Sequence, residues 1–274
     1  KMPQPSQPEE TVPPTEAKDA WVITDPQLPL SFSRNDLPLL EINNTAGVSI
    51  DPEQLLRQPT SWELTQEGPA VLILHTHGTE SFQELKDSKY RSVNQDENMI
   101  SIGREVARVL EEGGVQVIHD TTAHDAPSYN GSYTHARQAI QDYLAQYPSI
   151  RLVLDLHRDA SDGVDGQLRT ATDIGGEACA RLMLVMGTDA SGLSHPGWQT
   201  NLALGLKLQL QLEAVAPGIT RPINLRGQRF NQDMTPGSLL IEVGAAGNTH
   251  PEALLAAQTL GRAIVALAGG ANRE

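Results

Sequence analysis

Two histidines and a glutamate follow a short apolar run near residue 70. Directly after the run 71–74 come His75, His77 and Glu80, so that the last two have the spacing His-x-x-Glu. Zinc in hydrolases is usually held by three protein ligands, imidazole nitrogens and carboxylate oxygens among them, and one position stays open for water. A histidine and a glutamate at this spacing in a turn can converge on one ion. His77 and Glu80 are therefore predicted to be two ligands of a metal site.

A second apolar run, at 152–156, ends in His157. In largely parallel sheets, ligands and reacting groups gather at the carboxyl ends of strands, so we expect His157 to be the third ligand. His75 precedes His77 by two residues and shares its strand face if the strand continues that far. It is predicted to be a further ligand, a partner of a ligand or a hydrogen-bond donor to the transition state. The competing interpretation is that these histidines only cap strand ends. It is weakened because histidines follow two separate apolar runs, one of them with a carboxylate at ligand spacing.

A single acidic residue, Glu242, interrupts the apolar run 239–243. A buried charge is costly unless it is paired, so one interpretation is a salt-bridged glutamate of the core. The functional interpretation is a general base that takes a proton from the attacking water and then gives it to the leaving amine. Burial beside a metal would adjust the pKa of this carboxyl for that work.

Three basic side chains are candidates for substrate binding: Arg158, Arg229 and His124. Arg229 belongs to the segment 223–234, which has two arginines in an otherwise acidic chain. A guanidinium presents a fork of donors that matches a carboxylate. Pairing with local aspartates and glutamates is the competing interpretation. His124 follows the apolar run 115–118 within a polar stretch, where it either contacts substrate or belongs to a solvated loop.

The overall composition excludes several classes of site. The chain has 274 residues, is 39% hydrophobic, and has 20 Lys and Arg against 34 Asp and Glu, a formal charge of −14. This balance leaves no basic face for phosphates, so nucleic acid is not an expected partner. The single cysteine, Cys179, excludes an internal disulfide and a cysteine-rich metal site. A metal would therefore bind histidines and carboxylates. Ser161 and Ser238 lack the Gly-x-Ser-x-Gly turn of a serine hydrolase.

Alternating strands and helices must position these residues. From residue 68 onward the apolar pattern predicts several elements: strands at 70–74, 115–118, 152–156, 181–186, 222–224 and 239–243, and helices at 96–112, 134–147 and 251–268. The segment 201–216 has leucines at every second position, as a strand would, yet it is long and rich in strong helix formers, so we predict a helix. The alternation favours an α/β fold with a mixed, mostly parallel sheet and helices on both faces.

Three parts of the chain differ in composition. Residues 1–20 hold five prolines among polar residues, which predicts a disordered linker. Residues 21–67 have short apolar pieces and are expected to be an extension that packs on the core, and residues 68–274 are expected to form the catalytic domain. No apolar run approaches the about 20 residues that span a bilayer, so the chain as given is expected to be soluble. The proline-rich tail looks like a stalk, which leaves an anchor upstream open.

Residues 74–82, 155–160 and 231–244 read LHTHGTESF, DLHRDA and NQDMTPGSLLIEVG. These blocks, in this order, closely resemble the stage II sporulation protein P family of endospore-forming bacteria, and the resemblance extends from about Pro69 to Gly270. That family consists of zinc-dependent N-acetylmuramoyl-L-alanine amidases, related in fold to other cell-wall amidases and also described as cross-link endopeptidases. Its members are anchored by a membrane helix and act outside the cytoplasm, between the two membranes of the sporangium during engulfment, with sporulation proteins D and M.

By position, the resemblance implies the following site residues: ligands His77, Glu80 and His157, catalytic acid and base Glu242, and a special role for His75. Only one set of three ligands can be assembled from the chain, which predicts one zinc ion per chain. Related amidases place their glutamate ligand at the start of the next helix, where this chain has Glu97. The His-x-x-Glu spacing favours Glu80, and both assignments stay open. The implied function is hydrolysis, in peptidoglycan, of the amide between N-acetylmuramic acid and L-alanine.

Two other classes of function compete with this one. A different zinc amide hydrolase, such as a carboxypeptidase or an acyl-amino-acid deacylase, would need one dominant arginine facing a free carboxylate. A wall-binding protein without catalysis would keep the groove but dispense with Glu242, which this chain has.

Overall fold

The computed structural model describes residues 22–24, 31–59, 64, 67–163 and 166–269, and the predicted linker at 1–20 lies outside these ranges. Within them, a seven-stranded sheet has the order β3-β12-β11-β13-β6-β4-β5. Its strands are β3 (Ile42–Asn44), β4 (Val71–Leu74), β5 (Val117–His119), β6 (Leu152–Asp159), β11 (Leu182–Gly187), β12 (Ile223–Arg226) and β13 (Ser238–Ala245). All neighbouring pairs are parallel except β11 with β13. The predicted mixed, mostly parallel sheet is confirmed.

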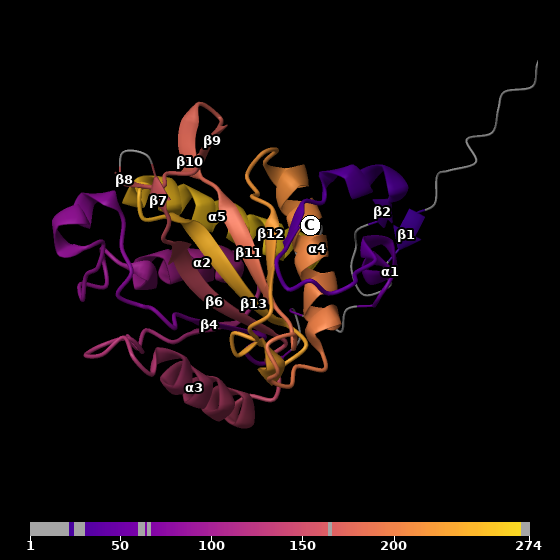
Figure 1. Cartoon of the computed structure of the whole chain (residues 1–274), viewed down its shortest axis with the longest axis horizontal. Coiled ribbons are helices and arrows are strands. Elements are labelled where there is room, and N and C mark those ends of the chain that lie inside the picture. The colour runs from indigo at the N-terminus through magenta and orange to yellow at the C-terminus, as the bar shows by residue number, and fades with distance from the viewer. Residues whose placement is uncertain (1–21, 25–30, 60–63, 65–66, 164–165, 270–274) are drawn as a thin grey trace, which may run out of the picture.

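Helices cover both faces of this sheet (Figure 1). One face carries α2 (Met99–Glu112), α4 (Trp198–Val215) and α5 (His250–Leu267), and the other carries α3 (Ser132–Gln146). Alternate side chains of a strand point to opposite faces. Leu154 and Ile241 accordingly belong to the main core with α2, α4 and α5, whereas Val153 packs with Leu72 and Ile140 on the α3 side. The parity of a residue in β6 or β13 therefore decides which layer it meets.

The helix predicted at 201–216 is confirmed as α4. All residues from Asn201 to Gln211 are buried, so this helix is covered on every side and not along one stripe. A helix buried all round carries no amphipathic period, which is why the alternating leucines resemble a strand. The helix predicted at 96–112 begins later, at Met99, because the Asn98 side chain accepts a hydrogen bond from the Ile100 N–H at 2.9 Å and caps it.

Part of the segment 21–67 belongs to the sheet and core, although its sequence predicted no elements. β3 pairs in parallel with β12 and forms one edge of the sheet. α1 (Pro52–Leu56) is capped by Asp51, and its Leu55 and Leu56 join the main core. Short hairpins are formed by β1 (Val22–Thr24) with β2 (Ser31–Ser33), β7 (Asp162–Gly163) with β8 (Gly166–Gln167), and β9 (Ala171–Ile174) with β10 (Glu177–Ala180). In the described ranges, no helix combines the length and the apolar character needed to cross a membrane.

The close approach of α2 to the sheet depends on Gly103. A Cβ at this position would lie 2.4 Å from His75 Nε2 and 2.6 Å from His119 Nε2. Gly103→Ala is therefore expected to lower the free energy of unfolding by about 1–3 kcal/mol through overpacking, although alanine favours helix. Urea unfolding measures this. The matched control is Gly205→Ala in α4, where the nearest atom is the flexible Met186 Sδ at 3.2 Å. Equal stability of the two alanine variants would contradict the expectation.

Candidate metal-dependent active site

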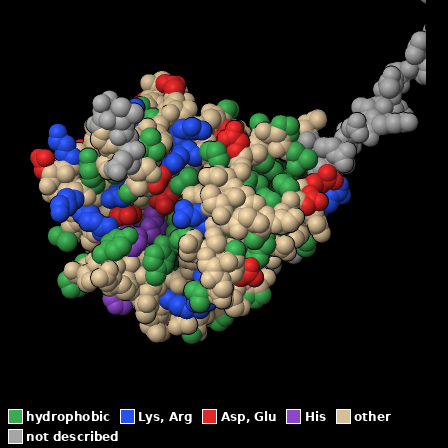
Figure 2. Space-filling model, viewed as in Figure 1, with side chains coloured by type: hydrophobic (Ala, Val, Ile, Leu, Met, Phe, Trp, Pro, Cys, Tyr) green, Lys and Arg blue, Asp and Glu red, His purple; other side chains and the backbone are tan. Residues whose placement is uncertain are grey.

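Three strands bring acidic and imidazole side chains together on the face that α3 covers. Leu240 of β13 is in register with Asp155 of β6, and Glu242 with His157. Asp155 and His157 share the parity of Val153 and so lie on the α3 side, as Glu242 does with Leu240. The turn after β4 adds His77 and Glu80 at the same end of the sheet. Histidine side chains are visible at the surface in Figure 2, bordered by acidic, basic and apolar side chains.

His157 lies between two buried carboxylates. Its Nδ1 is 3.6 Å from Glu80 Oε2, and its Nε2 is 2.9 Å from Asp155 Oδ1, close enough for an ion pair although the N–H is not aligned with the oxygen. Asp155 also accepts hydrogen bonds from the backbone N–H and the hydroxyl of Thr76, at 2.8 and 2.6 Å. Burial opposes charge, but the two carboxylates outweigh it and raise the pKa of His157 well above its usual value. His157 and Thr76 likewise outweigh burial and lower the pKa of Asp155 to about 2.

Arg158 holds Glu80 in place. The Arg158 Nη1 is 3.3 Å from Glu80 Oε1, and its backbone N–H donates to Glu80 Oε2 at 3.3 Å. Its other donors bind the Ser81 carbonyl at 2.9 Å and the Tyr90 carbonyl at 3.0 Å. Its side chain is 5% exposed. The prediction that Arg158 binds substrate does not agree with this position, because its guanidinium is buried and already used by the protein.

His77 is enclosed by three rings. It stacks on Tyr129 with the ring centroids 4.2 Å apart, and it meets Tyr133 edge-on at 5.5 Å and His157 at 5.2 Å. Its Nδ1 is buried and has no hydrogen-bond partner among the described residues. Burial, followed by the nearby His157, lowers the pKa of His77, so the ring is neutral at neutral pH and keeps a free lone pair.

Glu242 is the one carboxylate of this group without a cationic partner at bonding distance in the described ranges. It is half-buried, and its Oε2 is buried with no hydrogen-bond partner there. Burial raises the pKa of Glu242 to about 8, and the opposing effect of His157 is smaller. A carboxyl with such a pKa can both take up and release a proton near neutral pH.

His75 lies on the opposite face from the one predicted. β4 ends at Leu74 and a turn follows, so the strand parity that would have put His75 beside His77 does not continue. The His75 Nδ1–H donates to the Leu156 carbonyl at 3.1 Å, which leaves its Nε2 to accept from His119 Nε2–H at 2.9 Å. Burial, then His119, lowers the pKa of His75 to about 3. The residue is a buried neutral partner of the strand that carries His157.

Other predicted residues lie apart from this group. His124 is buried and its Nε2 contacts Asp120 Oδ2 at 3.0 Å, in the wall of a separate cavity against α3. Glu97 is exposed and accepts a hydrogen bond from the Ser92 hydroxyl at 2.8 Å, so Glu80 and not Glu97 is the glutamate beside His157. Arg229 lines a groove that reaches the site through Tyr133.

The chemistry of these side chains is that of zinc ligands, although within the described ranges no three His, Cys, Asp or Glu side chains lie close enough together to hold a metal ion. His157 Nδ1 and Glu80 Oε2 are 3.6 Å apart, and two ligand atoms on one tetrahedral zinc are about 3.3 Å apart for bonds of about 2.0 Å. The buried His77 Nδ1, which has no hydrogen-bond partner among the described residues, is the candidate for a third donor. Asp155 beside the other nitrogen of His157 is the carboxylate that commonly orients a ligating imidazole.

Comparison with known proteins agrees with the blocks described above. The model of the family "Stage II sporulation protein P (SpoIIP)" matches residues 9–265. The chain belongs to this family. Stage II sporulation protein P of Bacillus subtilis (strain 168) is 25% identical over 204 residues, which are 69% of this chain and 49% of that protein. The chain thus spans about half the length of that curated relative of the SpoIIP family.

Solved structures similar to this SpoIIP-family chain have low sequence identity to it. An N-acetylmuramoyl-L-alanine amidase from Clostridium difficile 630 is 17% identical with a TM-score of 0.46, covering 75% of this chain and 96% of that one. The catalytic domain of CwlV from Bacillus (Paenibacillus) polymyxa var. colistinus is 12% identical with a TM-score of 0.45, covering 72% and 96%. AmiC2 of Nostoc punctiforme is 13% identical with a TM-score of 0.41, covering 74% and 97%.

Sequence reasoning missed three residues of the site. Asp155 lies two residues before His157 inside an apolar strand, the same signal that pointed to Glu242, and it could have been found in that way. Tyr129 and Tyr133 come from the loop and helix start after residue 125. Their contacts with His77 had no sequence signal, because about fifty residues separate them from it.

Proposed function

We propose that this chain is a zinc-dependent peptidoglycan hydrolase that cleaves the amide between N-acetylmuramic acid and L-alanine during endospore engulfment. The observation that carries the proposal is the proximity of His77 and Glu80, in the turn after β4, to His157 of β6, which is in register with Glu242 of β13. Membership of the SpoIIP family supports the choice of peptidoglycan as substrate.

His77, Glu80 and His157 would hold the zinc ion. A bound zinc supplies a Lewis acid for the amide carbonyl and lowers the pKa of water. Asp155 orients the imidazole of His157, and Arg158 fixes the carboxylate of Glu80. Both positions are set before any ligand arrives, because the partners are buried and bonded to backbone groups.

Glu242 is proposed to move the protons. It takes a proton from the attacking water and gives one to the departing amine of L-alanine, so that the amine leaves uncharged. Its half-buried position on β13, between β6 and β11, raises its pKa, which suits a group that both takes up and releases a proton. His75 is proposed to act as a positioning residue only, through its hydrogen bond to the Leu156 carbonyl next to His157.

The place of action and the partners are proposed from family membership. Sporulation proteins D and M would be its protein partners, and the protein would act outside the cytoplasm, anchored to a membrane, between the two membranes of the sporangium. Cross-link endopeptidase activity is a second activity that the same site could support.

Digestion of purified sacculi, followed by mass spectrometry of the released material, tests the proposed bond. Stem peptides with a free L-alanine amino terminus are the expected products, and they should disappear after zinc chelation and return when zinc is added. Single C-terminal amino acids would instead indicate a carboxypeptidase, and cleaved cross-links alone an endopeptidase. Unchanged muropeptides in the presence of zinc would contradict the proposal.

A further inference from the structure

Two cavities lie near the candidate site, and each is lined by a tyrosine that contacts the His77 ring. Tyr129, which stacks on His77, lines a cavity of about 550 Å³ together with Arg91 and Asp125. Tyr133, which meets His77 edge-on, lines a groove of about 410 Å³ together with Arg137, Arg229 and Phe230. Both volumes fall in the range of about 300–1,000 Å³ that small-molecule sites occupy. An amide bond held at His77 would extend one of its halves into each cavity.

The groove and the cavity differ in charge. In the groove, Arg137 binds both oxygens of Asp233 at 2.8 Å, and Arg229 Nη1 contacts the same Asp233 Oδ2 at 3.2 Å. Two guanidinium groups thus share one carboxylate, and the excess is one positive charge in a chain whose formal charge is −14. In the cavity, Arg91 and Asp125 pair one to one at 2.8 Å, and no excess remains.

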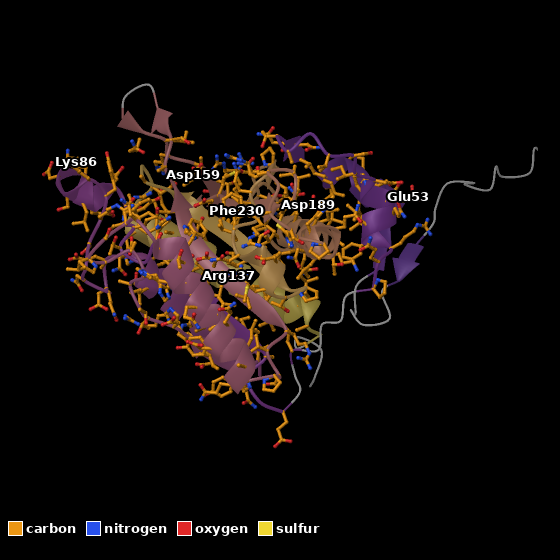
Figure 3. All side chains as sticks on the ribbon, turned by 60° about the horizontal axis from the view of Figure 1, so that its bottom comes forward. Glu53, Lys86, Arg137, Asp159, Asp189 and Phe230 are labelled. Atoms are coloured by element: carbon orange, nitrogen blue, oxygen red, sulfur yellow. The ribbon has the colours of Figure 1, made fainter. Side chains whose placement is uncertain are left out.

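Arg229 has donors left for a ligand. Its Nη1 contacts Asp233 and the Ser194 carbonyl, at 3.2 and 3.3 Å, and its Nε and Nη2 have no partner among the described residues. Its side chain is 24% exposed in the groove. Figure 3 turns α3 toward the viewer, with Arg137 and Phe230 labelled on that side. A carboxylate entering the groove would therefore meet an arginine that keeps two free donors.

The groove is held rigidly beside the site. Phe230 and Asn231 have φ values of 50° and 56°, a backbone conformation that non-glycine residues adopt only where packing enforces it. The Asn231 amide donates to the Tyr133 carbonyl at 2.8 Å, and Phe230 contacts the Tyr133 ring at a centroid distance of 6.1 Å. This loop therefore moves with the helix residue that touches His77, which suits a subsite that aligns a substrate.

We propose that the groove between α3 and the loop 227–231 binds the acidic stem peptide, with Arg229 on a peptide carboxylate, while the cavity at Tyr129 receives the uncharged sugar. The assignment rests on the proposed amidase function. The lactyl carboxyl of N-acetylmuramic acid is consumed in the amide, so the sugar half is neutral. The peptide half carries the free carboxylates, and its charge complements the groove.

Two soluble substrates test this assignment: N-acetylmuramoyl-L-alanyl-D-glutamate and its diamide, in which both carboxylates are carboxamides. Arg229→Gln is expected to raise KM for the diacid by about ten-fold or more, with kcat unchanged, and to leave KM for the diamide as it was. Arg229→Lys keeps the positive charge and should raise KM for the diacid less than Arg229→Gln does. Arg108→Gln removes the same charge from the exposed face of α2 and should leave KM and kcat unchanged for both substrates.

Calorimetry with the free peptide L-alanyl-D-glutamate supplies a readout that needs no turnover. Wild-type protein should bind it more tightly than Arg229→Gln does. If wild-type protein binds the peptide through Arg229 but cleaves neither substrate, the proposed function fails and the groove assignment stands. The assignment would be overturned if Arg229→Gln raised KM equally for the diacid and the diamide. It would also be overturned if Arg91→Gln, and not Arg229→Gln, raised KM for the diacid alone.

Discussion

Replacing Glu242 by glutamine is expected to lower the rate of stem-peptide release by about 100-fold to 10,000-fold, the usual contribution of a general acid or base. Glutamine keeps the size of the side chain but cannot accept the proton. Zinc content and binding to sacculi should be retained, since the proposed ligands are His77, Glu80 and His157. The measurement pairs turnover with zinc content by elemental analysis. Near-wild-type turnover would remove Glu242 from catalysis, and loss of zinc would make it a ligand.

The same substitution has an expected effect on stability with a defined pH range. Burial raises the pKa of Glu242 to about 8 from an ordinary value of 4.5. Between these values the folded metal-free protein binds more protons than the unfolded chain, so the contribution of Glu242 to stability falls as pH rises from about 4.5 to about 8. Glutamine does not titrate. Glu242→Gln should therefore melt at the same temperature as the wild type near pH 5 and at a higher temperature near pH 9.

Thermal melting of the metal-free proteins across this range measures the effect as a difference between wild type and variant, because other buried groups titrate in both. Glu242→Asp is the control, since it keeps the ionisable group but withdraws it from the site, and it should stay pH-dependent. A salt-bridged structural glutamate would give the reverse result, with the glutamine variant less stable at high pH.

Removing His157 is expected to abolish zinc binding and activity together. His157→Ala deletes one of three proposed ligands and leaves Glu80 and Asp155 as buried carboxylates facing each other without the imidazole. Breaking a buried pair in this way costs about 3–5 kcal/mol, so the variant should also melt earlier. Elemental analysis of protein purified without a histidine tag should give one zinc per wild-type chain and none for the variant.

His124→Ala separates metal loss from general destabilisation. His124 is also buried and also contacts a carboxylate, Asp120 Oδ2 at 3.0 Å, but it lies in another cavity. This variant should be destabilised and still hold one zinc. If His124→Ala lost the metal as His157→Ala does, or if His157→Ala kept it, His157 would not be a ligand.

Most of the secondary structure could be predicted because it is a local property of the chain. Short apolar runs gave the central strands, and helix formers gave α4 in spite of its alternating leucines. The edge strand β3 could not be predicted in this way, because three residues without an apolar pattern become a strand only when β12 offers them hydrogen bonds. Arg158 shows the same limit for the site. Its sequence position beside His157 is compatible with substrate binding, and only the folding of the loop after β4 over it decides its burial.

By itself, the sequence determined that polar groups end or interrupt apolar runs at His77, His157 and Glu242, and which family the chain resembles. Those facts depend on residue order, which is fixed before folding. The tertiary structure alone decided that His75 faces α2, because a turn ends the strand parity on which the prediction relied. It also decided that Arg229 shares one aspartate with Arg137, since the two arginines are 92 positions apart in the sequence and meet only when α3 packs beside the loop that precedes β13. Contacts of this kind depend on how layers pack, and no local pattern encodes them.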